Sequence, residues 1–400
     1  MTASPPARTA VLATAFAFLI VMAGTTLPTP LYAIYAEQLS FAPLMVTLLF
    51  AVYAFGVVAA LVVFGRLSDV IGRRPVLIAA VVLAILSTAL FLLPPALPVL
   101  FAARVLSGLA AGLMSGTGTA AIIDLFPAAR RASAGTLAVA VNAGGLALGT
   151  LGAGVLSALV AAPLVVPYAV YLALSVLALL GLIVLVPAPR VAAGARFRVQ
   201  RVSVPARIRA PFVRAVLAAG SGFAVLGVLT ATSALFLAGS LHLASHLLAG
   251  AVVGIAFFGM AVGQILARRM TAHRALVTGC LGLVASAAML GLAFAVTGLA
   301  WLIASAVVTG VAGGLCMNAA IGTTVERVEP AERGAVSSAF FAGVYLMLAV
   351  PAIIVGILAG ATSLSAAGLV LAIAVAVLAL VVACVELGAR GTGTTPEPGV

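Results

Sequence analysis

Residues 65–75 read GRLSDVIGRRP, a short polar stretch between two long apolar runs. Its chemistry lies in two glycines, one acid and an arginine pair: Gly65, Asp69, Gly72, Arg73 and Arg74. Glycine permits close helix approach and turn conformations that a side chain would penalise, and the carboxylate can pair with a basic neighbour or cap a helix N-terminus. The stretch therefore predicts a tight basic loop between two helices, on a membrane face where anionic lipid attracts arginine.

The apolar runs beside this loop are typical of the whole chain. Of its 400 residues, 65% are apolar and only 7% are charged, whereas soluble domains carry roughly a quarter charged residues. A water-soluble protein is therefore excluded. Since a helix crosses a bilayer with about 20 apolar residues, the chain is predicted to be an all-α membrane protein with twelve transmembrane helices. They are expected near residues 10–35, 44–64, 75–94, 97–123, 136–160, 165–187, 212–238, 247–267, 275–296, 299–324, 336–360 and 363–386.

The arginines test this map. All 20 basic residues are Arg, and with 8 acidic residues they give a formal net charge of +12. If the N-terminus is cytoplasmic, 19 of them lie on that same side when Arg214, at the start of the seventh span, is counted with the linker before it. Only Arg104 then lies inside a span. This positive-inside pattern predicts a plasma (inner) membrane protein with both termini cytoplasmic, and it explains the basic charge without a nucleic-acid partner. A signal peptide within residues 1–30 is the alternative, but its removal would leave an odd number of spans.

The chain divides into two similar halves. We expect an N-terminal six-helix bundle at 1–187, an Arg-rich cytoplasmic linker at 188–211 and a C-terminal bundle with a short tail at 212–400. The sequence SGLAAGL at 107–113 resembles TGVAGGL at 309–315, at an offset of 202 residues. Such duplication about an axis normal to the membrane is a transporter architecture. The linker is interpreted as a basic tether on anionic lipid, with a specific head-group or partner site as the alternative.

The loop at 65–75 resembles the signature of the major facilitator superfamily, G-x-x-x-D-R/K-x-G-R-R/K, with Val70 where a basic residue is usual. The resemblance implies a fold of two pseudo-symmetric six-helix bundles that transports a solute. It also implies that this loop is a cytoplasmic gate that latches the halves together, with Asp69 favouring the outward-facing state. The equivalent loop at 263–269 keeps the glycine and the arginine pair but has Ala267 in place of the acid.

Further motifs resemble the twelve-helix drug:proton antiporter branch of that family. RVLSGLAAG at 104–112 resembles the span-four motif R-x-x-x-G-x-x-x-G, whose arginine the branch ties to proton transfer, and TLPTPLY at 26–32 resembles its proline-rich end of span one. Residues 145–154 echo the span-five motif, with Thr150 in place of its proline. The resemblance implies proton-coupled efflux.

Arg104 is the first functional candidate, because a charge inside a span is costly; the alternative is an arginine that snorkels to the outer surface. Glu37 follows the first span and could pair with Arg104 and titrate during turnover, or it could be a hydrated loop carboxylate. The other candidates for the substrate pathway are polar or aromatic residues of the spans, for whose aromatic members packing is the alternative. They are Thr25, Tyr32, Ser115, Asn142, Phe223, Thr230, Asn318 and Tyr345.

This wall, with few charges, suits a small amphipathic or weakly polar molecule better than a phosphate ester, which needs several basic groups. We predict a monomeric secondary transporter that works by alternating access and exports such a substrate in exchange for protons, with membrane lipids around it. Uptake or exchange of a metabolite such as a sugar is the alternative, and a non-transporting receptor is a more distant one. No enzyme is predicted, since no nucleophile–base pair lies at membrane depth. No cofactor or metal is predicted either, because His242 and His246 lack further ligands.

Overall fold

The computed structural model describes residues 5–65, 67–187, 203–243 and 245–391. These residues form helices, and twelve of the helical segments are long and apolar enough to cross a membrane. The twelve predicted spans are therefore confirmed, with ends shifted by a few residues. In the first half they are built from α1 (Pro5–Thr26) with α2 (Tyr32–Gln38), α3 (Pro43–Phe64), α5 (Arg73–Phe91), α6 (Leu97–Asp124), α7 (Arg131–Leu159) and α8 (Val166–Leu185).

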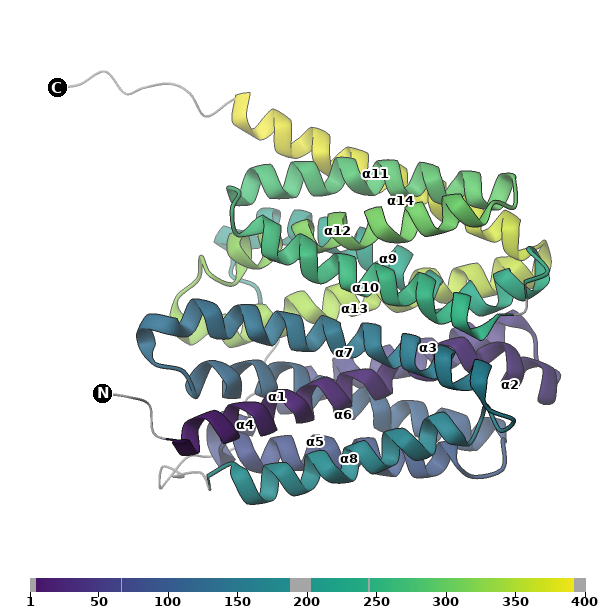
Figure 1. Ribbon diagram of the computed structural model, residues 1–400. Coiled ribbons are helices and arrows are strands. Elements are labelled where there is room, and N and C mark those ends of the chain that lie inside the picture. Colours follow the sequence, from purple (N-terminus) through teal and green to yellow (C-terminus); the bar gives the residue numbers. More distant parts are fainter. Residues whose placement is uncertain (1–4, 66, 188–202, 244, 392–400) are drawn as a thin grey trace.

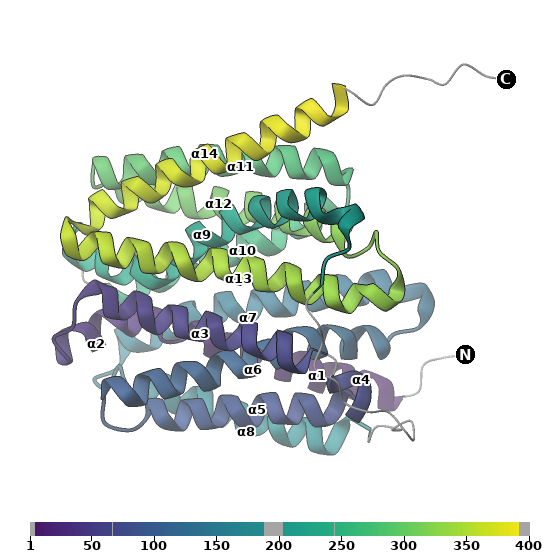
Figure 2. The same cartoon turned by 180° about the vertical axis from the view of Figure 1, so that it is seen from behind.

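The second half contains α9 (Arg209–Gly239), α10 (His246–Ala267), α11 (Ala272–Ala295), α12 (Leu299–Thr324), α13 (Pro330–Ala361) and α14 (Leu364–Gly391). Figure 1 shows the two groups of helices side by side. They meet where α7 packs on α10 and α3 packs on α13 (Figure 2). Residues 188–202 of the predicted linker lie outside the described residues, so the boundary between the halves stays a prediction. Within the predicted linker, Ala206–Ile208 form the 3₁₀ turn η3, and α9 begins at Arg209, three residues before the predicted span.

The first span is broken, unlike the continuous helix predicted from the sequence. α1 ends at Thr26, the 3₁₀ turn η1 (Thr29–Leu31) follows, and α2 then continues in the same direction along the bundle. The break falls on Pro28 and Pro30, because proline has no N–H to donate and clashes with the preceding helical turn. It leaves carbonyl groups at the end of α1 without helical partners.

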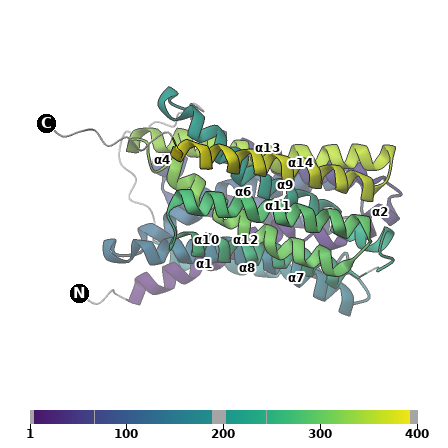
Figure 3. The same cartoon turned by 90° about the horizontal axis from the view of Figure 1, so that it is seen from above.

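Short turns close the two ends of the bundle. At one end lie α4 (Leu67–Ile71), the 3₁₀ turn η2 (Ala128–Arg130), and the start of α5, α7 and α11. We call this the arginine-rich end, since Arg73, Arg131 and Arg274 begin or nearly begin those helices. α2 lies at the opposite end (Figure 3).

The duplicated sequence makes the same helix crossing in both halves. A Cβ on Gly108 would lie 2.2 Å from the carbonyl oxygen of Tyr53 and 3.0 Å from Cα of Gly56, where α6 crosses α3. A Cβ on Gly310 would lie 2.2 Å from the carbonyl oxygen of Ala256 and 3.0 Å from Cα of Gly259, where α12 crosses α10. Backbones this close exclude any larger residue, so both motifs serve the same packing.

Candidate functional site

Arg104 is a buried charge in the interior of the first half. It lies on α6, about 10 Å along the helix from its start at Leu97, and only 1% of the residue is exposed. Its Nη1 donates a hydrogen bond of 2.8 Å to the carbonyl oxygen of Thr25, and its Nε donates one of 3.4 Å to the carbonyl oxygen of Leu49. The break after α1 supplies the first of these acceptors, because Thr25 lies in the last helical turn.

Tyr53 completes the surroundings of this arginine and connects it to the second half. The guanidinium carbon of Arg104 lies 4.4 Å from the centre of the Tyr53 ring, a cation–π contact. The Tyr53 hydroxyl lies within hydrogen-bonding reach of the side chains of Thr25 and Tyr345. On the far side of this contact, the rings of Tyr345 and Phe223 meet edge to face with 6.2 Å between centres.

Four of the predicted pathway residues therefore gather around one residue that sequence reasoning missed. We call the group formed by Thr25, Tyr53, Arg104, Phe223 and Tyr345 the central cluster. It joins α1, α3 and α6 of the first half to α9 and α13 of the second half. The sequence does contain one indication that Tyr53 belongs to the site. It lies three residues before Gly56, so both residues are on the face of α3 that packs against α6.

Tyr32 lies beside this cluster at the broken end of the first span. It is 2% exposed, its hydroxyl has no hydrogen-bond partner among the described residues, and it interacts electrostatically with Arg104. Farther along α2, the hydroxyls of Tyr35 and Tyr168 are 3.2 Å apart, and the ring of Tyr168 stacks on Phe91 at 4.8 Å between centres. Aromatic side chains thus fill the first half between the central cluster and the opposite end.

Of the two alternatives for Glu37, the structure shows an exposed carboxylate and no described pairing with Arg104. Glu37 is exposed near the end of α2, and no ion pair between these two residues occurs among the described contacts. The reason is the helical period: α2 turns Tyr32 and Tyr35 inward, and Glu37 follows Tyr35 by about 200° of rotation. Arg104 instead donates hydrogen bonds to backbone carbonyl oxygens. A carboxylate in the same place would also have to lose its hydration, which costs free energy.

Four other candidates lie away from the central cluster. The hydroxyls of Ser115 and Thr230 donate to carbonyl oxygens of their own helices, at Ala111 and Leu226. The buried Oδ1 of Asn142 on α7 has no partner among the described residues. Asn318 on α12 is half-buried. None of the four has a described contact with Arg104, so their place in a pathway stays a prediction.

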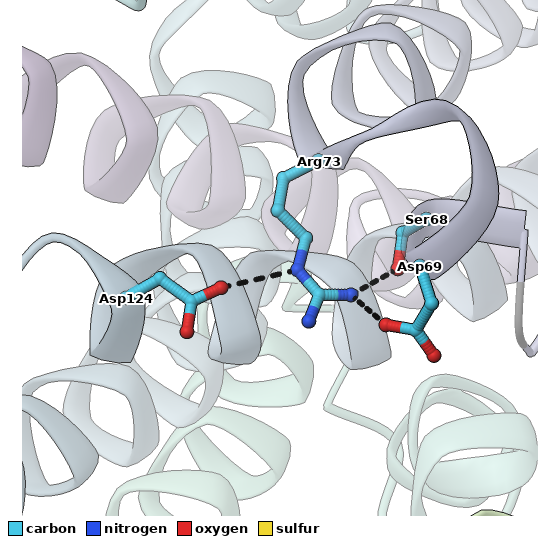
Figure 4. A network of polar contacts seen from close by, with 4 residues as sticks. All are labelled: Ser68, Asp69, Arg73 and Asp124. Atoms are coloured by element: carbon cyan, nitrogen blue, oxygen red, sulfur yellow. Dashed lines mark hydrogen bonds and ion pairs between the residues drawn. The ribbon is translucent and has the colours of Figure 1, made fainter. Parts of the chain in front are cut away.

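Two residues of the predicted gate, Asp69 and Arg73, form a compact network with Ser68 and Asp124 at the arginine-rich end (Figure 4). Nη1 of Arg73 lies 2.5 Å from Oδ1 of Asp69 and 2.6 Å from the hydroxyl of Ser68, and its Nε lies 3.2 Å from Oδ2 of Asp124. Gly72 adopts φ 92°, a left-handed conformation that favours glycine. The side chain of Arg73 therefore connects the loop after α3 to the end of α6. Both elements belong to the first half, so the described contacts of this network lie within that half.

Arg74 and Gly65 have separate parts in the same loop. Nε and Nη2 of Arg74 donate to the carbonyl oxygens of Leu182 and Ile183, at 3.2 and 2.5 Å. These carbonyl groups end α8, where helical partners are missing, and a cation there also meets the negative end of the helix dipole. Gly65 caps α3 and is exposed.

Contacts between the halves occur at both ends of the bundle. At the arginine-rich end, Nη1 of Arg268 donates to the hydroxyl of Thr136 and, at 3.2 Å, to the carbonyl oxygen of Ala132. At the opposite end, Nδ1 of His246 lies 3.1 Å from the carbonyl oxygen of Pro30. A Cβ on Gly250 would lie 2.3 Å from the carbonyl oxygen of Thr150. Among the described hydrogen bonds at the arginine-rich end, those of Arg268 join the two halves, whereas those of Asp69 and Arg73 stay within the first half, so the latch function of the 65–75 loop stays a prediction.

The described residues hold no group of three or more His, Cys, Asp or Glu side chains that could bind a metal ion. His246, expected in a solvated loop, instead begins α10 and contacts the first half.

The comparisons with known proteins agree with this architecture. Residues 14–349 match the model of the Major Facilitator Superfamily. The fold is similar to a bacterial homolog of the human lysosomal transporter Spinster, solved in an inward-facing and occupied conformation, with TM-score 0.68, 17% identity, and 97% of this chain and 98% of that chain covered. An inward-facing and unoccupied structure of that homolog gives TM-score 0.70 at 16% identity over the same shares of the two chains. No curated protein sequence matches this chain significantly. On the family match, which spans most of its length, this chain belongs to the major facilitator superfamily, a family of multi-pass membrane transporters.

Proposed function

We propose that this protein is a monomeric secondary transporter that exports a small amphipathic molecule across the plasma membrane in exchange for protons. The observation that carries the proposal is the central cluster, in which one buried cation and several aromatic rings join the two halves. In alternating access, the halves rock about a site near the midplane. A site whose walls come from both halves is opened and closed by such a motion.

The arginine-rich end faces the cytoplasm in this proposal, and both termini are cytoplasmic. The positive-inside pattern supports this orientation. The contacts at both ends of the bundle then have opposite functions. Arg268 and Thr136 close the cytoplasmic side, while the close approach of Gly250 to Thr150 closes the outer side. Transport requires each set of contacts to break in turn.

Proton coupling is assigned to Glu37 together with Arg104. Glu37 is exposed at the outer side, where it can exchange protons with water. It lies in the same short helix as Tyr32, which interacts electrostatically with Arg104. A change in the charge of Glu37 can therefore reach the central cluster through the position of α2. The resemblance of the span-one and span-four motifs to the drug:proton antiporters supports export over import.

The test uses everted membrane vesicles that are acidified inside by respiration. A pH-sensitive dye reports the proton gradient while small aromatic amines, amides and carboxylates are added one at a time. We expect a substrate to accumulate in the vesicles and to dissipate part of the gradient, with Glu37→Gln transporting the substrate without moving protons.

Other outcomes would each exclude part of the proposal. Accumulation without any loss of the gradient would contradict proton coupling. Uptake only into right-side-out vesicles would favour import of a metabolite such as a sugar. Binding to the purified protein with transport in neither orientation would favour a receptor.

A further inference from the structure

Among the described residues, no acidic side chain pairs with the buried charge of Arg104. An arginine side chain stays protonated in proteins, and this one is 1% exposed. Seven of the eight acidic residues are described, and all lie near helix ends or in the turns between helices: Glu37, Asp69, Asp124, Glu326, Glu329, Glu332 and Glu386. The described ion pairs of these acids involve other basic residues at the arginine-rich end. A buried cation held only by carbonyl oxygens and a ring lacks most of the stabilisation that an anion would supply.

The duplication shows that helix packing does not require this charge. In the crossing of α12 with α10, the residue equivalent to Arg104 is Ala306, four residues before Gly310, and the residue equivalent to Tyr53 is Ala256. Both alanines are fully buried. Because the second half makes the same close crossing with two methyl groups, the arginine and the tyrosine are additions to a junction that forms without them.

Two residues that interact electrostatically, Arg104 and Tyr32, both have unused hydrogen-bonding groups. Only two N–H groups of Arg104, out of five, have described hydrogen bonds. The Tyr32 hydroxyl is buried, interacts electrostatically with Arg104 and has no described partner. A buried hydroxyl without a partner costs free energy, and an anion that accepted hydrogen bonds from both residues would satisfy it.

We propose that the transported molecule is an organic monoanion, a carboxylate or sulfonate on an aromatic or apolar body. Its anionic group binds Arg104 and the Tyr32 hydroxyl, and its body packs against the rings of Phe223 and Tyr345. One guanidinium matches one negative charge, whereas a phosphate ester would bring a second charge without a second cation. This inference rests on the proposed transport function, since it names the substrate class for the same site.

The direction of transport agrees with this charge. A membrane potential that is negative inside drives a monoanion outward, with about 2.3 kcal/mol per elementary charge for each 100 mV. Exchange of the anion for an incoming proton adds to that driving force. Export of such a substrate therefore needs no carboxylate within the spans, and the described spans contain none in their interior.

The experiment measures the melting temperature of the purified full-length protein in nanodiscs with matched pairs of compounds. The pairs are naphthalene-1-carboxylate and its amide, 4-phenylbutanoate and its amide, and indole-3-acetate and its amide, with 1-naphthylmethylammonium as the cationic counterpart. Carboxylates are ionised at about pH 7.5. We expect at least one carboxylate to stabilise the protein at a concentration about tenfold below that of its amide, as one charge-assisted contact predicts.

Variants of Arg104 and Tyr32 test whether these residues cause the preference for a carboxylate over its amide. Arg104→Gln should abolish the advantage of the carboxylate over the amide, Arg104→Lys should keep part of it, and Tyr32→Phe should reduce it. Arg131→Gln, at an exposed arginine, should behave like the unmodified protein. If Arg104→Gln does not fold, Arg104→Lys and Tyr32→Phe decide the question, because both must weaken carboxylate binding more than amide binding.

The inference is overturned if no carboxylate stabilises the protein more than its amide, or if the ammonium compound binds best. Transport assays in everted vesicles distinguish an error in the proposed substrate class from an error in the proposed export function. Accumulation of amides or amines without any carboxylate preference would contradict the monoanion and leave export standing. Arg104-dependent binding of a carboxylate without accumulation would contradict export and leave the anion site standing.

Discussion

Among the described glycines between α7 and α10, Gly250 leaves the least room for a Cβ, and enlarging it should open the end of the protein that we propose faces outward. A Cβ at this position would lie 2.3 Å from the carbonyl oxygen of Thr150, 3.0 Å from its carbonyl carbon and 3.4 Å from Cα of Gly154. These are backbone atoms, which cannot rotate away. Since ordinary contact begins near 3.4 Å, Gly250→Ala requires the two helices to separate by about 1 Å.

The magnitude follows from the cost of overpacking. Inserting a methylene into a packed contact costs about 1–3 kcal/mol. In Gly250→Ala this cost destabilises only the conformation in which α7 and α10 are in contact at the end opposite the arginine-rich end. That free energy shifts the equilibrium toward an outward-open state by about 5–150-fold. Gly152→Ala is the matched control, because its Cβ would meet no atom within 4 Å and it gains the same helix propensity of about 1 kcal/mol.

The assay follows the accessibility of a cysteine introduced at Thr25, which is 3% exposed in this structure. In a background without the native cysteines, a membrane-impermeant thiol reagent is applied to right-side-out vesicles. We expect Gly250→Ala to raise the labelling rate at least about fivefold, from the same energies, and Gly152→Ala to leave it unchanged. Equal labelling rates in the two variants would refute the assignment of this contact to the outer closure.

Two further predictions concern stability. Tyr53→Phe keeps the ring over Arg104 but loses the hydroxyl near Tyr345, so the free energy of unfolding should fall by about 1 kcal/mol; an unchanged thermal midpoint would show that the hydroxyl contact contributes nothing. Glu386→Gln should lower the thermal midpoint more than Glu332→Gln, because the Glu386 side chain is 14% exposed and pairs at 2.6 Å whereas that of Glu332 is 34% exposed; the reverse order would contradict this.

The sequence alone predicts much of the fold because the bilayer imposes simple rules. Span length, the one-sided arginines and the repeated glycine motif each follow from the cost of placing polar groups in lipid. The break at Pro28 and Pro30 was missed, since apolar residues continue across it and hydropathy does not register a lost N–H.

The site was predicted in part. Arg104 stood out because a charge in a span is rare. Tyr53 was missed because one tyrosine in an apolar helix has no mark of its own until the neighbouring helix is placed. The sequence leaves two alternatives open for Glu37, because closeness along the chain does not determine which face of a short helix a residue occupies.

The proposed transport requires that the central cluster is reached in turn from each side of the membrane. A cysteine at Phe223, tested with an impermeant thiol reagent in right-side-out and in everted vesicles, examines this without knowledge of the substrate. We expect labelling from both sides, with Gly250→Ala increasing it in right-side-out vesicles and decreasing it in everted ones. Labelling from one side only, or changes of the same sign in both preparations, would contradict alternating access at this site.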